Sequence, residues 1–236
     1  MIACVRAGRF MIRVLYEDNH LLVVVKPPNL PVQQDASGDE DLLRILKGYL
    51  GNKYQKPGNV YLGLVHRLDR PVGGVMVFAR TSKAAARLSQ AFARHAQRRI
   101  YLAVLQGELD KERVLEDWLR KDADGMVRVV APEAPAAKLA RLVTRPLAVR
   151  EGRTLARVEL FTGRSHQIRV QHAHAGLPLW GDARYGGGKS GQQIALWAYR
   201  MEFEHPTKRQ SMRFCALPAA TGAWTAFDDI IKELPQ

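Results

Sequence analysis

Apolar and polar residues alternate along most of the chain in short runs, which is typical of β-strands separated by turns. Each run is five to eleven residues long and ends at residues that favour turns. The pattern predicts strands over Ile12–Tyr16, Leu21–Lys26, Tyr61–Val65, Val75–Ala79, Ile100–Gln106, Leu139–Val149, Thr154–Leu160, Ala195–Glu204 and Ser211–Ala216.

Three short polar segments predict tight connections between neighbouring strands. The tetrapeptide of residues 17–20 separates the first two strands, and Pro27-Pro28 ends the second because proline lacks the ladder donor. Asp124-Gly125 lies between Trp118–Lys121 and Met126–Val130 and is a strong hairpin signal. Glu151-Gly152 predicts another hairpin.

Helical spacing is found in fewer places. Residues 41–50 carry apolar side chains at helical intervals, with Asp39 or Asp41 as the N-cap. Thr81 or Ser82 is placed to cap a helix whose apolar face ends at Phe92. Two further helices are predicted over residues 163–175 and 224–234.

Many strands and few helices favour an α+β fold with a central, mostly antiparallel mixed sheet flanked by helices and loops. The length of 236 residues suits one compact domain. We expect residues 1–11 to form a loose N-terminal tail and residues 12–236 to form a single domain.

Charge adds the first functional constraint. The chain has 36 Lys and Arg against 23 Asp and Glu, a formal net charge of +13. Such a surface attracts polyanions, so nucleic acid is the first candidate partner and an anionic membrane surface the second. A basic soluble protein without such a partner is the alternative.

Several classes of protein are disfavoured. Cys4 and Cys215 are far apart and belong to no paired-cysteine motif, which argues against a disulfide scaffold or a cysteine zinc site. The apolar runs are of strand length, which predicts no transmembrane helix, and the first residues do not resemble a signal peptide. The cytoplasm is the expected location.

The densest polar cluster within an apolar frame is His66-Arg67-Leu68-Asp69-Arg70. Cations on both sides of Asp69 favour its ionised form, and such a carboxylate is suited to act as nucleophile or base on a polyanionic substrate. The alternative is an ion pair at a surface turn.

A second cluster covers residues 162–172. We expect one of Arg164 and Arg169 to reach phosphate and the other to point into a site; a basic helix that touches only phosphates is the alternative. The spacing of His166, His172 and His174 fits no metal motif. Residues 186–190 lack the frame of a phosphate-binding loop. No metal site is therefore expected.

Four ordered motifs resemble those of the RluA-type pseudouridine synthases. The resemblance runs from about residue 12 to about residue 217, with no S4-type extension before it. The motifs are Leu21–Pro27, His66–Arg70, Thr162–Arg169, and Gly181-Asp182 with Tyr185-Gly186.

The resemblance implies an enzyme that isomerises uridine to pseudouridine in structured ribosomal or transfer RNA, by base flipping and without cofactor or metal. Asp69 matches the catalytic aspartate, which either attacks C1′ or removes the C2′ proton. Tyr101 matches the tyrosine that packs on the uracil and helps to move the C5 proton. Arg169 matches the arginine that pairs with the aspartate, and Arg67 the residue that fills the gap left by the flipped nucleotide.

Further residues are expected at the RNA. Leu68 or Ile168 would sandwich the base with Tyr101, and His66 and Arg164 would also contact RNA. Two departures from the family pattern are Pro71–Gly74, which affects substrate choice more than chemistry, and Val25, a packing change.

Two other functions stay open from the residues alone. A non-catalytic RNA-binding module or chaperone would need none of the three catalytic residues. An N-glycosidase would release the free base. A monomer with RNA as its partner, and no membrane or small-molecule cofactor, is the expectation.

Overall fold

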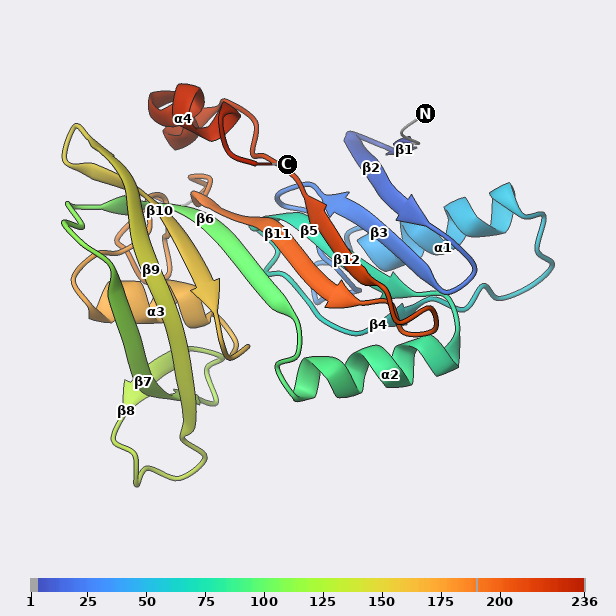
Figure 1. Ribbon diagram of the computed structural model, residues 1–236, viewed down its shortest axis with the longest axis horizontal. Helices are drawn as coiled ribbons and strands as arrows, with labels where there is room; N and C mark the ends of the chain where they lie inside the picture. The colour runs from blue at the N-terminus through green and yellow to red at the C-terminus, as the bar shows by residue number, and fades with distance from the viewer. Residues whose placement is uncertain (1–3, 190, 236) are drawn as a thin grey trace. The chain divides into compact units, whose positions relative to one another are not determined.

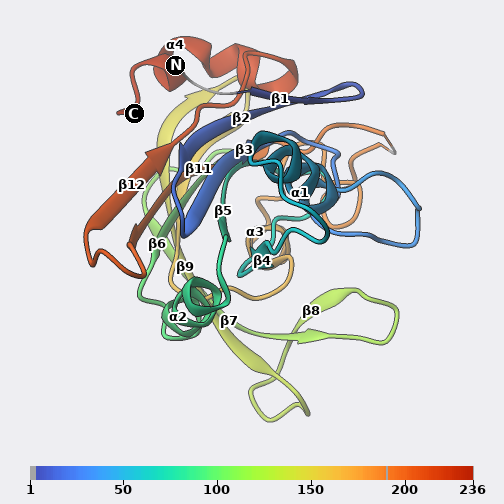
Figure 2. The ribbon, with the colours of Figure 1, turned by 90° about the vertical axis from the view of Figure 1, so that its right-hand side faces the viewer.

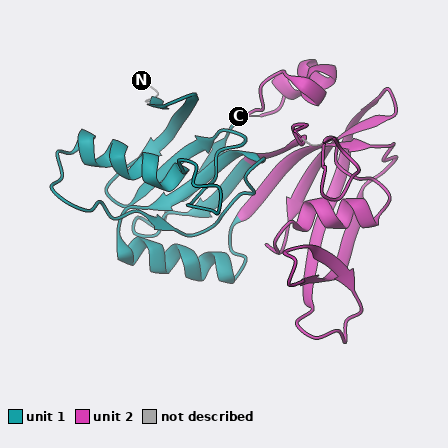
Figure 3. Ribbon diagram, turned by 180° about the vertical axis from the view of Figure 1, so that it is seen from behind, with its two compact units in different colours: residues 1–97, 200–216 teal, residues 98–199, 217–236 magenta. Residues whose placement is uncertain are grey.

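The computed structural model describes residues 4–189 and 191–235 (Figure 1). It confirms an α+β fold built on a mostly antiparallel sheet. The chain divides into two compact units, drawn in separate colours in Figure 3: unit 1 contains residues 1–97 and 200–216, and unit 2 residues 98–199 and 217–236. No helix in the described part of the chain is both long and apolar enough to cross a membrane.

Unit 1 is built around two buried neighbouring strands, β3 and β5, paired antiparallel with Leu21 opposite Ala79. All seven residues of β5 are buried, as are five of the six in β3. Figure 2 shows β2, β3 and β5 running side by side, with α1 in front of them. The strands of the unit are β1 (Cys4–Ala7), β2 (Phe10–Glu17), β3 (Leu21–Lys26), β4 (Gly63–Leu64), β5 (Gly73–Ala79), part of β11 (Leu196–Glu204) and β12 (Ser211–Cys215).

Both helices of unit 1 begin at residues that the sequence identifies. The Asp41 carboxylate accepts from the backbone N–H of Arg44 at the start of α1 (Leu42–Lys53). The Thr81 hydroxyl does the same for Ala84 at the start of α2 (Ser82–Ala93). Each cap satisfies a backbone donor that the helix itself leaves unpaired.

The expected loose tail over residues 1–11 is wrong for residues 4–11. Strand β1 pairs antiparallel with β2, with Cys4 opposite Arg13, and Gly8 turns the chain with φ of +51°. Residues 1–3 lie outside the described part. The hydrogen bonds of this four-residue strand come from β2, so its own composition gives little signal.

Unit 2 contains an antiparallel sheet in the order β6-β10-β9-β7-β8, with α3 packed against β7 and β8 (Figure 1). Its strands are β6 (Arg98–Gln106), β7 (Arg113–Lys121), β8 (Val127–Val130), β9 (Lys138–Arg150) and β10 (Arg153–Leu160). Its helices are α3 (Gln167–His174), the 3-10 helix η1 (Gly222–Phe227) and α4 (Asp228–Lys232).

Both predicted hairpins of unit 2 are confirmed. Gly125 turns the chain between β7 and β8 with φ of +77°. Glu151 and Gly152, both with positive φ, connect β9 and β10.

Element boundaries differ from the sequence prediction at several places, and three of them bear on the fold. Helix α3 begins at Gln167 rather than Gly163, because His166 has a left-handed backbone (φ +51°). The strand predicted over residues 61–65 shortens to the two residues of β4. The C-terminal helix predicted over residues 224–234 divides into η1 and α4.

Candidate active site

The loop between β4 and β5 carries Asp69, and a buried lysine stabilises its backbone through hydrogen bonds. The Lys26 ammonium is fully buried and donates to the carbonyl oxygens of Val72 (2.7 Å), Arg70 (2.9 Å) and Pro27 (3.1 Å). Within the loop, the backbone N–H of Val72 donates to the Asp69 carbonyl at 3.0 Å. The Asp69 backbone is thus enclosed by hydrogen bonds that fix the path of the chain on its C-terminal side.

Burial lowers the pKa of Lys26 to about 7, although the nearby Asp69 carboxylate acts in the opposite direction. Donation to three carbonyl oxygens requires the ammonium form, so burial and the hydrogen bonds act in opposite directions on the charge of this lysine near Asp69. The sequence places Lys26 in the motif Leu21–Pro27 but does not indicate a role for it. The available signal was a lysine at the end of an apolar strand, directly before a proline.

His66 fixes the other side of the same loop. Its Nε2 accepts from the backbone N–H of Val77 at 3.0 Å, and its ring stacks on Phe92 with centroids 5.0 Å apart and planes 12° apart. A ring nitrogen that accepts from an amide is unprotonated, so this contact favours the Nδ1–H tautomer. The structure thus uses the half-buried His66 to attach the loop to β5 and α2; RNA contact by this residue stays a prediction.

The next side chains of the loop differ in exposure. Arg67 is exposed, Leu68 is buried, and Asp69 is half-buried. Arg70 leads away to the loop before α1, where it pairs with Asp35 and Asp39. The loop therefore places a carboxylate beside one exposed cation and one cation that is already paired.

Arg169 lies in the first turn of α3 and is buried together with a carboxylate. Its Nε and Nη2 donate to the two carboxylate oxygens of Asp182 at 2.9 and 2.8 Å, and the two side chains are 8% and 1% exposed. The Tyr185 ring packs under the guanidinium, with 5.2 Å from the ring centroid to Cζ. Sequence motifs three and four meet at this contact, which the sequence did not predict.

Asp182 is stabilised as an anion despite its position. Burial alone would raise the pKa of this carboxyl group, but the Arg169 guanidinium and the backbone N–H groups of Arg184 and Tyr185 hold it below its usual range. The loop approaches closely because Gly181 has no side chain: a Cβ there would lie 2.3 Å from the Gln193 carbonyl oxygen. Glycine at position 181 is thus needed for the close packing of the segment that carries Asp182, the partner of Arg169.

Tyr185 also fixes the loop that precedes α3. Its hydroxyl lies 2.8 Å from Nδ1 of His166 and accepts from the backbone N–H of Val127 at 3.0 Å. The Gln167 side chain completes this junction, because its amide oxygen accepts from Thr162 and from the backbone N–H of Arg164.

Tyr101 is on β6 and is 8% exposed. Arg99, two residues earlier, is also buried, and burial lowers the pKa of its guanidinium while Tyr101 acts in the opposite direction. The Arg99 Nη2 donates to the Thr162 carbonyl at 3.1 Å. The guanidinium occupies space left by Gly163, where a Cβ would lie 2.6 Å from Nη1. Arg99 thereby links the strand of Tyr101 to the loop before α3.

The remaining predicted RNA-contact residues of unit 2 already have contacts inside the unit. Arg164 donates from Nε to the Leu139 carbonyl at 2.9 Å. Ile168 is 4% exposed, and its carbonyl lies 2.8 Å from Nδ1 of His172. Their predicted contacts with RNA are not tested by these observations.

The predicted site residues thus form two constellations, one in each unit. His66, Arg67, Leu68 and Asp69 are consecutive on one loop of unit 1. Arg164, Ile168 and Arg169 lie at the start of α3 in unit 2, where Tyr101 is on β6. Across residues 4–189 and 191–235, no three His, Cys, Asp or Glu side chains come together as a metal ion would require.

Comparison with known proteins identifies a family and relatives that match most of the chain. The model of the RNA pseudouridylate synthase family matches residues 20–174. An uncharacterized RNA pseudouridine synthase of Helicobacter pylori is 32% identical over 216 residues, covering 86% of this chain and 65% of the relative. The tRNA pseudouridine synthase C of Vibrio cholerae is 29% identical over 225 residues, covering 86% of this chain and 89% of the relative.

Among solved structures, human RNA pseudouridylate synthase domain containing 4 superposes with a TM-score of 0.73 at 21% identity, covering 94% of each chain. This likeness supports the fold. The match to the family model confirms the family that the four motifs predicted. The chain spans just under two thirds of the Helicobacter relative's length.

Proposed function

The chain belongs to the RNA pseudouridylate synthase family, and on that premise we propose that it isomerises uridine to pseudouridine in structured RNA. Residues 12–236 are proposed as the catalytic domain, acting as a monomer in the cytoplasm. The observation that carries the proposal is the Asp69 loop, where a carboxylate of the family motif stands on a backbone fixed by the buried Lys26.

The proposed reaction needs no external reactant. The bond from N1 of uracil to C1′ of the ribose breaks, the base turns, and a bond from C5 to C1′ forms. The proton that leaves C5 is balanced by one gained at N1, so the product is an isomer of the substrate. Asp69 has two chemically sound roles: its carboxylate attacks C1′, or it removes the C2′ proton.

Tyr101 and Arg169 are proposed to complete the site. Tyr101 would pack on the uracil and assist transfer of the C5 proton, with the base sandwiched by Leu68 or Ile168. Arg169 would pair with Asp69. One observation supports that pairing: Asp182 holds the planar guanidinium of Arg169 in one orientation through its Nε and Nη2.

Base flipping is proposed because the target atoms of a stacked nucleotide are inaccessible, and unstacking costs a few kcal/mol. The exposed Arg67 is suited to fill the space left by the flipped nucleotide. His66 and Arg164 are proposed to contact the RNA around it. Transfer RNA and ribosomal RNA are both candidate substrates; the name of the Vibrio relative points to transfer RNA.

The test removes the Asp69 carboxylate, and the asparagine variant does so without changing the size of the side chain. We expect Asp69→Asn and Asp69→Ala to lower pseudouridine formation by about 10⁴-fold or more, because covalent or acid–base catalysis is removed. Tritium release from [5-³H]uridine-labelled RNA measures the product. Asp110→Asn, at an exposed aspartate of unit 2, is the matched control and should retain full activity.

Wild-type activity in Asp69→Asn would overturn the mechanism. Mass analysis of the RNA and of the released bases separates the other two functions. Free uracil would identify a glycosidase, and RNA binding without any product would identify a binding module.

A further inference from the structure

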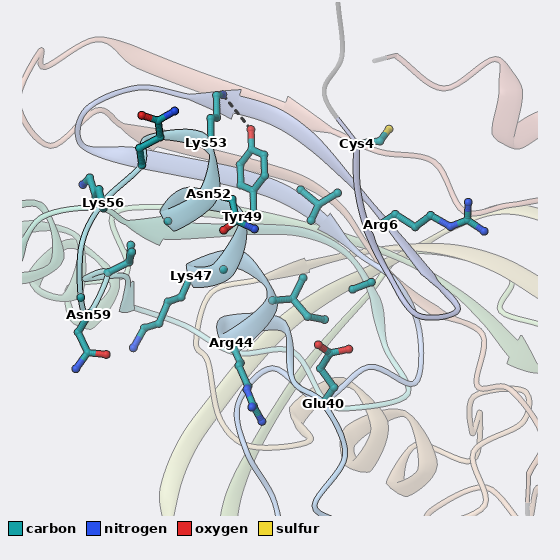
Figure 4. Close-up of a pocket in the computed structure, with 18 residues that line it drawn as sticks. Cys4, Arg6, Glu40, Arg44, Lys47, Tyr49, Asn52, Lys53, Lys56 and Asn59 are labelled. Carbon is teal, nitrogen blue, oxygen red and sulfur yellow. Dashed lines mark hydrogen bonds between the residues drawn. The ribbon is translucent and has the colours of Figure 1, made fainter.

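A basic groove in unit 1 has no part in the chemistry described above. Helix α1, the segment after it and strand β1 line a cavity of about 1340 Å³ (Figure 4). We call it the α1–β1 groove. Its charged lining residues are five cations and one carboxylate: Arg6, Arg44, Lys47, Lys53, Lys56 and Glu40.

Most of these cations are not used by the protein itself. Lys53 pairs with Glu17 at 2.8 Å. Within residues 4–189 and 191–235, by contrast, Arg44, Lys47 and Lys56 form no ion pair. All three are exposed. Elsewhere in unit 1, Lys208 pairs with Asp18 and Arg213 with Glu202. The three groove cations differ from these two in leaving exposed charges close together along α1 and the segment after it.

The cations are distributed over a length that suits a chain rather than a single anion. Arg44 is in the first turn of α1, Lys47 in the second, and Lys56 just beyond its end. A 12-residue helix is about 18 Å long, so these charges extend well beyond one phosphate group. In Figure 4, Arg44 and Lys47 extend from α1 toward the same side.

The lining between the cations includes an exposed glycine and two asparagines. Gly48 is exposed, and a Cβ built on it would meet nothing within 4 Å, so the backbone of α1 can be approached closely there. Asn52 and Asn59 add amide groups to the lining, which both donate and accept hydrogen bonds. Ribose hydroxyls and phosphate oxygens are the natural partners of such a mixture.

The composition of α1 argues against a membrane as the partner. A helix that lies in a bilayer interface exposes an apolar face. In α1 the apolar side chains of Leu42, Ile45, Leu46 and Leu50 are buried inside unit 1, and the exposed side carries cations, glycine and asparagine. Helix α1 therefore offers charge without an exposed apolar face to insert.

The groove is also connected to the Asp69 loop through the chain. Its carboxylate residue, Glu40, follows Asp39, which pairs with Arg70 beside Asp69. The backbone N–H of Asn29, earlier in the same loop, donates to the Arg70 carbonyl at 2.9 Å. A polyanion bound along α1 would thus lie next to the segment that contacts the candidate catalytic loop.

We propose that the α1–β1 groove binds the sugar–phosphate backbone of the substrate RNA, outside the nucleotide that reacts. The inference rests on the proposed function only in taking RNA as the substrate. It assigns Arg44 and Lys47 a role in RNA affinity and none in the chemical step.

The test compares two double variants that remove one arginine and one lysine each. Arg44→Ala/Lys47→Ala removes two of the five cations of the groove. Lys83→Ala/Arg94→Ala removes exposed cations at the two ends of α2. Fluorescently labelled, unfractionated bacterial tRNA is the probe. Its Kd is measured by anisotropy between 50 and 300 mM KCl, without turnover.

We expect the groove variant to bind about 10-fold more weakly at 100 mM KCl and the α2 variant less than about 2-fold more weakly. The slope of log Kd against log salt should fall by about 2 for the groove variant, because two phosphate contacts are lost. At saturating RNA the kcat of the groove variant should match the wild type, with a raised KM.

Equal affinity and equal salt slope for the two double variants would overturn the proposal. So would loss of binding to phosphatidylserine-containing vesicles in the groove variant with its tRNA binding intact. The melting temperature of each variant is measured first, and Arg44→Gln/Lys47→Gln replaces the alanine variant if that one is destabilised. Because binding is measured without catalysis, the result stands even if no pseudouridine is formed.

Discussion

The Asp69 loop and the start of α3 each depend on a buried basic side chain, but the two charges are compensated in different ways. Lys26 donates to three main-chain carbonyl oxygens, and no carboxylate among residues 4–189 and 191–235 is hydrogen-bonded to it. Arg169 forms a two-pronged ion pair with Asp182. The Lys26 contacts fix a backbone, whereas the Asp182 contacts fix the orientation of a side chain.

The difference fits what each region has to position. A loop is held best through its carbonyl groups, and an ammonium with three donors can reach three of them. A guanidinium is planar, so a carboxylate at two of its nitrogens also sets the direction of the others. Four predictions test this comparison, in decreasing order of expected effect.

Asp182→Ala should cause the largest loss of stability, about 3–5 kcal/mol in the free energy of unfolding, because the buried Arg169 guanidinium loses the carboxylate that accepts from its Nε and Nη2. Urea denaturation measures the loss. Asp229→Ala is the matched control: Arg150 and Asp229 form the same two-pronged contact, but the side chains are 42% and 62% exposed. The control should lose far less stability, because solvent screens an exposed ion pair. Equal losses would show that burial of the Arg169 pair is unimportant.

His172 in α3 is another buried basic side chain, and it has fewer hydrogen bonds than Lys26 or Arg169. Burial lowers its pKa to about 4, and Nδ1 lies at hydrogen-bond distance from the Ile168 carbonyl, whereas Nε2 has no hydrogen-bond partner in the described part of the chain. The unfolded chain therefore binds a proton as the pH falls from about 6.5 to about 4, while the folded chain does not. Stability is fully present above that window and should fall by about 3 kcal/mol across it.

Denaturation at pH 7 and at pH 4.5 measures this decrease. In His172→Leu the contribution of the histidine should vanish, so its stability should depend less on pH than that of the wild type. An identical pH dependence in both proteins would contradict the assignment.

Lys26→Met should destabilise the protein by about 2 kcal/mol, since three carbonyl oxygens lose their donor while a desolvated charge is also removed. The effect is smaller than that of Asp182→Ala because no charge is left unpaired in the Lys26 pocket. Catalysis should fall as well, because the Asp69 loop is no longer fixed. Lys83→Met, at an exposed lysine of α2, should change neither stability nor activity. Full activity in Lys26→Met would show that the loop holds its shape without the ammonium.

The smallest effect concerns how the helices begin. Thr81→Ala should lower stability by about 1 kcal/mol, because α2 loses the hydroxyl that accepts from Ala84. Thr81→Ser keeps the hydroxyl and should stay within about 0.5 kcal/mol of the wild type. In contrast to α2, α3 starts after the left-handed His166 without a side-chain cap hydrogen bond. Its start depends on Tyr185 and Gln167, so no single hydroxyl replacement there is equivalent.

Local sequence was sufficient for much of the fold. The N-caps Asp41 and Thr81 and the turns at Gly125 and Gly152 were predicted because each depends on a few neighbouring residues. The sequence failed at β1 and at the start of α3. There the backbone conformation depends on partners far along the chain: β2 for one, Tyr185 for the other.

The site shows the same division. The motifs identified the family and named Asp69, Tyr101 and Arg169 as candidates, because the reactive residue types and their neighbours in the sequence carry that information. The support of these residues was not predicted. Lys26 and Arg70 are 44 positions apart, and Arg169 and Asp182 are on different segments, so only folding brings each pair together.

The sequence by itself thus determined most of the strand pattern, the starts of α1 and α2, the net charge and the family, since each is a property of composition or of short-range pattern. Only the tertiary structure decided which buried charges are compensated by carbonyl groups and which by a carboxylate. It also decided which surface cations remain unpaired at the α1–β1 groove. The physical reason is that hydrogen bonds and ion pairs depend on distances in space, which the chain sets by packing residues that are far apart in sequence.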